Sequence, residues 1–134
     1  MIIVVDTNRI IAALIKNGVS RQILFSKNFH FITPSFTLTE ISKYKKHIMK
    51  KAVINENQFW QLLDIIFERV RIIPKTDYEN KIRIVTQLIS DKEDISFLAL
   101  AISQNCNGIW SDDAHFLEQN KVKIFTTKKM IRIL

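Results

Sequence analysis

The sequence has few of the residues that mark linkers, disulfides and irregular structure. Its 134 residues include two glycines, two prolines and one cysteine. So few glycines and prolines argue against long flexible linkers, and the length is that of one domain, which we expect to cover residues 1–134. The single cysteine, Cys106, cannot form a disulfide within the chain, so the expected location is the reducing cytoplasm.

Long apolar runs are absent as well. The opening run ends at Val5, where Asp6 interrupts it, and it is too short for a signal peptide or a membrane span. No later apolar stretch approaches the length that is needed to cross a bilayer. We therefore expect a protein without membrane attachment.

Acidic residues are scarce in the first part of the chain. The whole sequence has 20 Lys and Arg residues against 13 Asp and Glu residues, a net charge of +7. Between Met1 and Asn55 there are nine basic residues and only two acids, Asp6 and Glu40. This balance favours a polyanionic partner, nucleic acid before membrane. The two isolated acids each need an explanation.

Short apolar segments alternate with amphipathic ones along the chain. The run before Asp6 has the character of a strand that is buried on both faces. Further strands are expected at residues 30–33, 71–73, 109–111 and 122–125. Helices are expected over residues 7–15, from residue 20, over residues 35–51, 55–70, 76–90 and 93–105, at residues 116–117, and from residue 126 or 127. Because no hairpin signal separates the strands, the pattern predicts an α/β fold, a parallel sheet with helices on both faces.

Polar residues at the expected helix starts predict specific caps. Such side chains satisfy the N–H groups that the first turn of a helix leaves without partners. Gly18 is expected to end the first helix. The candidate caps are Thr7 or Asn8, Ser20, the pair Asn55 and Gln58, the pair Thr76 and Glu79, and Asp91.

Acidic residues can meet at one edge of this sheet. Asp6 follows the first strand, Asp112 and Asp113 follow the fourth, Asp94 opens a helix, and Glu40 lies early in another. Ligands of open parallel sheets bind beyond the carboxyl ends of the strands. Two like charges about 4 Å apart repel by roughly 4 kcal/mol at an effective dielectric constant near 20. An all-oxygen cluster of this kind indicates a site for Mg²⁺ or Mn²⁺, which can orient a phosphodiester and activate water.

At these residues the sequence resembles the PIN-domain family, which includes the VapC-type toxin ribonucleases. The resemblance lies in VVDTN at residues 4–8, Glu40, DISFLALAI at 94–102 and IWSDDAHF at 109–116. It covers essentially the whole chain, in the family's order and spacing. It implies three α/β/α layers around a five-stranded parallel sheet in the order 3-2-1-4-5. It also implies a metal-dependent endoribonuclease that uses Mg²⁺ or Mn²⁺.

The resemblance also assigns roles by position. It implies that Asp6, Glu40, Asp94 and Asp113 are catalytic, with Asp6, Asp94 and Asp113 as metal ligands and Asp112 as the second choice for the last ligand. Glu40 would bind metal or position water. From the same resemblance we expect RNA as the substrate, a small antitoxin as a partner, and a homodimer.

Basic side chains near these acids have two interpretations. Lys43 and Lys46 belong to a basic run on one expected helix, which is either a solvated face or a contact for the RNA backbone. Arg9 stands where the family usually has an apolar residue, so it is an RNA-binding candidate or a cation that neutralises Asp6. His115 stands where a further Asp is frequent, and we treat it as structural because it has no ligand spacing.

The acids have structural interpretations too. Asp6 can serve as a helix cap, Glu40 can be a solvated helix residue that pairs with Lys43 or Tyr44, and Asp94 can be a first-turn residue that the helix dipole favours. Asp112 and Asp113 can form an ordinary turn.

Two other functions compete with the nuclease. A phospho-receiver domain would need an acid after the third strand, which here ends at Ile73 and Pro74. A catalytically idle PIN fold that binds RNA or protein is the stronger alternative, since Arg9 would then block metal binding.

Overall fold

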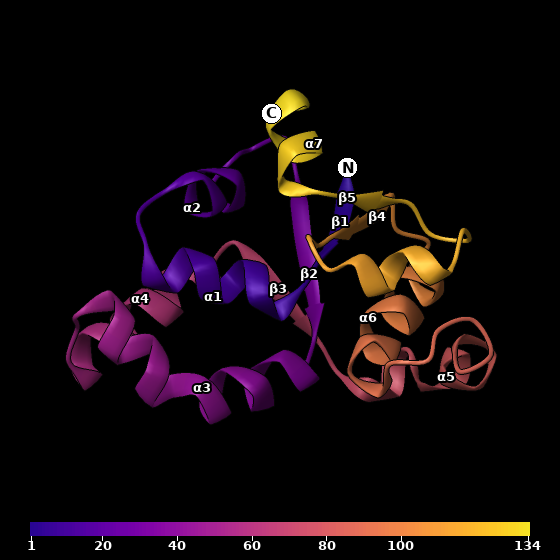
Figure 1. Cartoon of the computed structure of the whole chain (residues 1–134), viewed down its shortest axis with the longest axis horizontal. Coiled ribbons are helices and arrows are strands. Elements are labelled where there is room, and N and C mark those ends of the chain that lie inside the picture. Colours follow the sequence, from indigo (N-terminus) through magenta and orange to yellow (C-terminus); the bar gives the residue numbers. More distant parts are fainter.

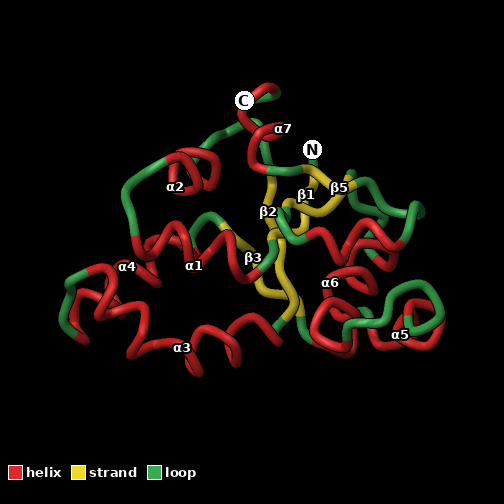
Figure 2. Tube along the Cα trace, viewed as in Figure 1, coloured by secondary structure: helices red, strands yellow, loops and turns green.

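Five short strands form an all-parallel sheet in the middle of the molecule. The computed structural model describes residues 1–134, and its strands are β1 (Ile2–Val5), β2 (His30–Pro34), β3 (Val70–Ile73), β4 (Gly108–Trp110) and β5 (Ile124–Phe125). Their order is β3-β2-β1-β4-β5, and every neighbouring pair is parallel. Figure 2 shows this sheet with helices on either side of it. The predicted fold class and strand order are confirmed.

The central strand β1 contributes side chains to the hydrophobic cores on both faces of the sheet. Alternate residues of a strand point to opposite faces, and both faces are covered here. Ile3 and Val5 belong to one core cluster, whereas Val4 belongs to the other. Because β1 lies between β2 and β4, its carboxyl end, at Asp6, opens in the middle of the sheet edge.

The helices of the first half cover one face of the sheet (Figure 1). They are α1 (Thr7–Ile15), α2 (Val19–Leu24), α3 (Phe36–Ala52) and α4 (Glu56–Phe67). Their buried residues form a core cluster of 18 residues, which also includes Trp110 of β4 and Met130 of the last helix, α7 (Thr127–Arg132).

The opposite face is covered by α5 (Glu79–Val85) and α6 (Lys92–Ser103), with the short 3₁₀ helices η1 (Lys75–Asp77) and η2 (Ala114–Glu118) nearby. Their core cluster includes Tyr78, Phe97 and Phe116. None of the helices combines the length and the apolar character that a membrane span requires.

Two of the predicted caps are confirmed, and a third cap was not predicted. Asn55 and Gln58 form a reciprocal capping box at the start of α4. The Asp91 carboxylate accepts a hydrogen bond of 2.9 Å from the Glu93 N–H at the start of α6. Thr126 caps α7 in the same way, through the Lys129 N–H.

The predicted helix over residues 76–90 is wrong in both length and start. The segment first makes a 3₁₀ turn, in which the Tyr78 N–H donates to Lys75 O at 3.1 Å. The buried Tyr78 side chain anchors this turn in the core, so Tyr78 rather than Thr76 occupies the N-cap position of α5. The helix ends early, at Val85, where the Thr86 hydroxyl donates to Arg83 O at 2.6 Å and so competes with the backbone ladder.

The first helix also starts differently from the prediction. Asp6, not Thr7 or Asn8, holds the N-cap position, because the Thr7 side chain is turned toward α3 and hydrogen-bonds there. Gly18 does not end the first helix, which stops at Ile15. It stands instead at the N-cap position of α2, so Ser20 lies inside that helix.

Candidate functional site

Asp6 is the buried acid at the carboxyl end of β1. Asp6 is 7% exposed, and its carboxylate Oδ2 accepts a hydrogen bond of 2.7 Å from the Ser111 hydroxyl. Burial raises the pKa of Asp6, and the charge of Asp113 raises it further, whereas the Ser111 hydrogen bond and the charge of Arg9 lower it. Asp6 occupies the N-cap position of α1, and a contact with the Asn8 backbone lowers its pKa, so a place at the helix start and a place in the acidic group are compatible.

Ser111 joins Asp6 to Asp113. The Ser111 Oγ that donates to Asp6 also accepts the Asp113 N–H at 3.0 Å. One hydroxyl therefore connects the Asp6 carboxylate to the Asp113 backbone, beyond the ends of the neighbouring strands β1 and β4. A polar cleft of about 260 Å³ opens here, lined by Asp6, Asn8, Arg9, Asp112 and Asp113.

Asp94 is the third acid of the group and lies in the first turn of α6. It is 6% exposed, and its Oδ2 is buried without a hydrogen-bond partner. Burial raises the pKa of Asp94 to about 7, and the charges of Asp91, Asp113 and Asp6 act in the same direction, with His115 opposing them. The charges of Asp6 and Asp113 thus act directly on Asp94.

Glu40 reaches the same edge of the sheet from α3. Its Oε1 accepts a hydrogen bond of 2.6 Å from the Thr7 hydroxyl, so its close partner is Thr7. Burial raises the pKa of Glu40, the Thr7 hydrogen bond lowers it, and the charges of Glu93 and Asp6 raise it. Glu93, which the sequence analysis did not single out, is therefore a further acid beside the site. Its position one residue before Asp94 was the available signal.

Buried threonines fix the position of Glu40. The Thr7 and Thr37 hydroxyls lie 3.1 Å apart, Thr37 and Thr33 lie 2.8 Å apart, and Thr33 donates to Val5 O at 3.0 Å. This series of hydroxyl groups links the Glu40 carboxylate to the backbone of β1. Sequence reasoning missed the chain, because its members are polar residues on three different elements.

Arg9 pairs with Asp112, not with Asp6. The Arg9 Nη1 lies 3.0 Å from Asp112 Oδ2. The Asp112 carboxylate also accepts the Thr127 N–H at 2.7 Å and the Thr127 hydroxyl at 2.6 Å. Asp112 therefore ties α1 to the start of α7, and both of its oxygens are engaged. The neighbouring residue Asp113 donates its backbone N–H to the Ser111 hydroxyl that binds Asp6.

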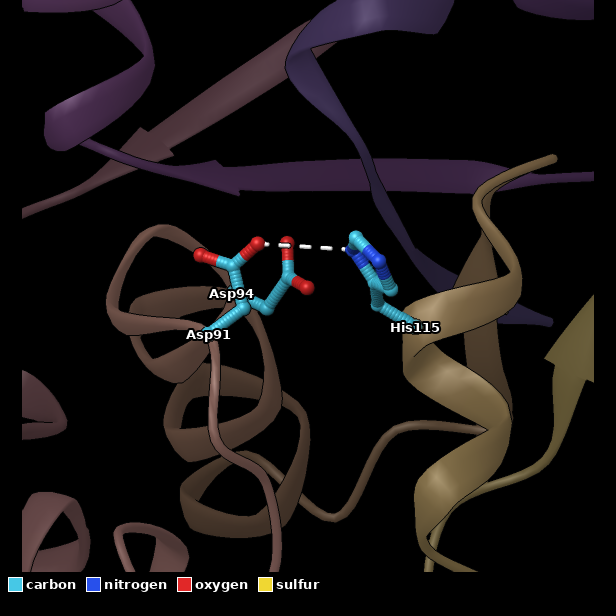
Figure 3. A group of neighbouring side chains, drawn as sticks. All are labelled: Asp91, Asp94 and His115. Carbon is cyan, nitrogen blue, oxygen red and sulfur yellow. Dashed lines mark ion pairs between the residues drawn. The ribbon is translucent and has the colours of Figure 1, made fainter.

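Asp91 and His115 lie next to the buried acids and were not among the predicted site residues. His115 Nδ1 is 3.4 Å from Asp91 Oδ2 and 3.3 Å from Asp113 Oδ1. One ligand atom each from Asp91, Asp94 and His115 lie within 4.8 Å of one another. Figure 3 shows the two carboxylates at the start of α6 facing the imidazole from η2. The SDD turn places His115 here, so its position in that motif was the available signal.

The basic run on α3 is divided between two environments. Lys43 and Lys46 are exposed, whereas Lys45 forms an ion pair with Glu56 and lies 5.0 Å from the centre of the Trp60 ring. The charge of Lys43 also lowers the pKa of Glu40, so Lys43 lies on the side of the helix near the acids. The RNA contacts of Lys43, Lys46 and Arg9 stay predictions.

The donor set fits a hard divalent cation. Such ions prefer carboxylate oxygens, and the group contains Asp6, Asp94 and Asp113. Asp94 Oδ2 is a buried oxygen without any partner, and a buried charge of this kind requires a proton or a cation. No Lys or Arg forms an ion pair with any of these three acids.

Comparison with known proteins places the chain in a family. A family model described as PIN domain matches residues 4–132. No curated protein matches the chain by sequence. The chain is similar in structure to a chain in the crystal structure of VapBC2 from Rickettsia felis, which was solved bound to a DNA fragment from the promoter. The TM-score is 0.70 and the sequence identity is 24%. The match covers 94% of this chain and 98% of the other chain. At that identity the structural likeness shows a common fold. The family model spans nearly the whole chain, and the chain belongs to the PIN domain family.

Proposed function

We propose that this protein is a metal-dependent endoribonuclease that hydrolyses RNA phosphodiester bonds. The observation that carries the proposal is the gathering of Asp6, Asp94 and Asp113 at one edge of the sheet, with Asp94 Oδ2 buried and without a partner. Membership of the PIN domain family supports the same activity. The proposed cofactor is Mg²⁺ or Mn²⁺.

Each acid has its own part in this proposal. Asp6, Asp94 and Asp113 would hold the cation, with Asp112 as the second choice for the last position. A divalent ion at this place would neutralise charge on the phosphodiester and lower the pKa of an attacking water. The Ser111 hydroxyl holds the Asp6 carboxylate and the backbone N–H of Asp113.

Glu40 would act on the proton of the attacking water. Its Oε1 is held by the Thr7 hydroxyl, which leaves Oε2 as the atom for proton transfer. A general base works best when its pKa lies near the working pH, and burial moves the pKa of Glu40 upward in that direction. The threonine chain behind Glu40 prevents the side chain from moving away.

The charge distribution supports an RNA substrate. The protein carries a net charge of +7 although its proposed site is acidic. Lys43 and Lys46 are exposed on α3, and Arg9 lines the acidic cleft. We propose that these three residues bind phosphates on either side of the bond that is cleaved.

We further propose that the protein is the toxin of a toxin–antitoxin pair and acts in the cytoplasm as a homodimer. The structural likeness to VapBC2 supports this proposal. A small antitoxin would then bind the protein and inhibit it.

The decisive experiment compares RNA cleavage by the wild type and the Asp6→Asn variant. Cleavage of a fluorescent RNA with Mn²⁺ should fall by about 100-fold or more in the variant, because a preorganised charged group in an active site is worth roughly that much. Asp64→Asn, the same change at an exposed acid on α4, is the matched control and should cleave normally. Unchanged cleavage by Asp6→Asn would contradict the proposal.

A thermal measurement separates the nuclease from the idle fold. A ligand that binds only the native state raises the melting temperature, so Mn²⁺ should raise that of the wild type. If millimolar Mn²⁺ has no effect and no RNA is cleaved, the chain is instead a module that binds RNA or protein.

A further inference from the structure

We propose that the Trp60 ring on α4 stacks on a base of bound single-stranded RNA, while lysines of α3 bind the phosphates beside that base. This inference rests on the proposed function and adds to it a contact with a base, away from the acidic group. The contact surface consists of Lys43, Lys45, Lys46, Glu56 and Trp60, and we call it the α3–α4 surface.

Trp60 is the exposed one of the two tryptophans. It is 44% exposed, whereas Trp110 is fully buried. The Trp60 ring packs in a T-shaped arrangement against Phe59, with the ring centres 5.2 Å apart, and Phe59 belongs to the core of the first helical layer. Phe59 therefore holds the indole in place from the core side. Every base has a π face, so an exposed aromatic ring in a fixed position can serve as a stacking platform.

A basic cleft of about 420 Å³ lies between α3 and the start of α4. Three lysines and a single acid line it, together with one hydroxyl and one thioether: Lys43, Lys45, Lys46, Glu56, Ser42 and Met49. Lys45 connects the cleft to the ring, because its Nζ lies 5.0 Å from the centre of the Trp60 ring. A positively charged groove beside an aromatic ring is the combination that binds single-stranded nucleic acid.

Lys45 has an ion pair that a phosphate can replace. Lys45 pairs with Glu56, whose side chain is 59% exposed, and Lys45 and Trp60 both lower the pKa of Glu56. Because exposed ion pairs stabilise a fold very little, a role as a clamp between α3 and α4 does not explain this arrangement. When RNA binds, the Lys45 side chain can turn from Glu56 to a phosphate, and a base can take its place over the ring.

The α3–α4 surface lies within reach of RNA that is bound at the acidic group. Figure 1 shows α3 leading from the carboxyl edge of the sheet toward α4. Glu40 and Lys45 are five residues apart on this helix, which is about 7.5 Å along its axis. The charge of Lys43, between them in the sequence, already acts on Glu40. A strand that follows α3 away from the acids therefore reaches the lysines and then the ring.

The charge of the α3–α4 surface favours RNA over a protein as the occupant. The cores of protein interfaces are depleted of charged residues, whereas this ring is bordered by Lys45 and Glu56. Lysines outnumber the single acid in the cleft, and Lys50 and Lys51 continue the basic run along α3. A polyanion with flat bases matches both the charge and the ring.

The test is titration of the full chain in EDTA with single-stranded oligouridylate, followed by tryptophan fluorescence and by the anisotropy of a labelled oligomer. A base that stacks on Trp60 should quench its emission, and the buried Trp110 should contribute no change. Trp60→Phe keeps a ring for stacking, so it should retain affinity within about twofold of the wild type while the quenching disappears.

Trp60→Ala should weaken binding of the oligomer by at least about fivefold, the lower end of the range for one stacked base. An abasic oligomer of the same length should bind Trp60→Ala and the wild type equally, because its phosphates still reach the lysines. Phe25→Ala removes an exposed ring at the end of α2 and is the matched control, with unchanged affinity for both oligomers.

Glu56→Gln tests the exchange of partners by Lys45. The neutral side chain releases Lys45 and removes a charge that repels phosphate, so RNA affinity should rise by about twofold. Lower affinity in this variant would contradict the exchange.

Two further results would overturn the proposal. Binding of RNA without any change in tryptophan emission would place the strand elsewhere and leave the ring for a protein partner. Equal losses of affinity for the two oligomers in Trp60→Ala would show that the ring only supports the fold. None of these readouts requires a metal ion or cleavage, so failure here and failure of the proposed nuclease activity are distinguishable.

Discussion

Single residues at the carboxyl edge of the sheet are held together against their mutual repulsion. Burial raises the pKa of Asp6, Glu40 and Asp94, and in each case a neighbouring acid raises it further. Hydroxyl groups, Ser111 for Asp6 and Thr7 for Glu40, provide the compensation that the protein itself contains. Without a cation, the repulsion among Asp6, Glu40 and Asp94 lowers the free energy of unfolding at neutral pH.

The pH dependence of stability should reveal Asp94. Its pKa rises from an ordinary 3.8 to about 7 in the folded protein, so between those values the folded state binds the proton more tightly than the unfolded state. The Asp94 contribution to the free energy of unfolding is therefore largest at low pH and is lost as the pH rises from about 4 to about 7. Asp91, Asp113 and Asp6 add to the shift, and His115 opposes it.

The measurement is denaturant unfolding in EDTA at several pH values, for the wild type and Asp94→Asn. The neutral side chain removes this titration, so the variant should gain stability relative to the wild type as the pH rises from 5 to 7.5. Asp64→Asn, at an exposed acid, should show no such trend. A difference between Asp94→Asn and the wild type that does not change with pH would contradict the assigned pKa.

At the scale of elements, the close approach of β4 and β5 fixes the position of the turn Ser111–Asp113, which follows β4. A Cβ atom added to Gly108 would lie 2.5 Å from the Phe125 ring and 2.6 Å from Lys123 O. The two strands can therefore pair at this distance only because Gly108 has no side chain. This pairing brings Phe125 O within 3.0 Å of the Ser111 N–H and so fixes the residue that holds Asp6 and Asp113.

Gly108→Ser should destabilise the protein by about 1–3 kcal/mol, the usual range for overpacking. The backbone of Lys123 must shift, because a carbonyl cannot rotate away as a side chain can. Gly18→Ser is the matched control: its Cβ would lie no closer than 3.6 Å to Lys16, and serine is a preferred N-cap. Thermal and denaturant unfolding measure both variants, and equal stabilities would refute the steric argument.

At the scale of the whole molecule, an excess of basic residues accompanies an acidic cleft. The basic run lies on α3, one of the helices that cover the first face of the sheet (Figure 1). Its residues Lys43 and Lys46 are exposed. Phosphate binding by such residues releases counterions, which makes the affinity depend on salt. The number of lysines that touch RNA can therefore be read from that dependence.

The double variant Lys43→Glu and Lys46→Glu should bind single-stranded RNA more weakly. If both lysines contact phosphates, the slope of log affinity against log salt should become shallower by about 1.4, since each contact contributes roughly 0.7. Lys50→Glu with Lys51→Glu makes the same charge change near the far end of α3 and is the control. Identical slopes in the two double variants would assign the effect to net charge and not to contact.

Local patterns were enough to predict most of the architecture. Apolar runs bounded by polar residues identified all five strands, and caps such as Asn55 and Asp91 were recognisable because they act within a few residues of the helix that they start. The strand order 3-2-1-4-5 came from the family resemblance and is confirmed. The largest error among the helices is the segment over residues 76–90, where burial of Tyr78 overrode the apparent capping box, and the cap assignments around Gly18 were wrong as well.

Sequence order could also indicate which acids meet. Asp6 and Asp113 end neighbouring parallel strands, and the burial of Asp94 follows from its place at the start of a helix that packs on the sheet. Side-chain contacts between elements could not be predicted in this way. The threonine chain behind Glu40, the pairing of Arg9 with Asp112, and the approach of His115 to Asp91 join residues that lie far apart in the sequence.

The sequence by itself therefore determined the strands and most of the helices, and it indicated acids at the edge of the sheet, whereas the strand order came from the family resemblance. Periodicity, capping and burial act over short stretches, and parallel crossovers leave few topologies. Only the tertiary structure decided that Arg9 pairs with Asp112 while Asp94 Oδ2 remains without a partner. The direction of a long side chain depends on which groups from other elements surround it, and no local pattern encodes those groups.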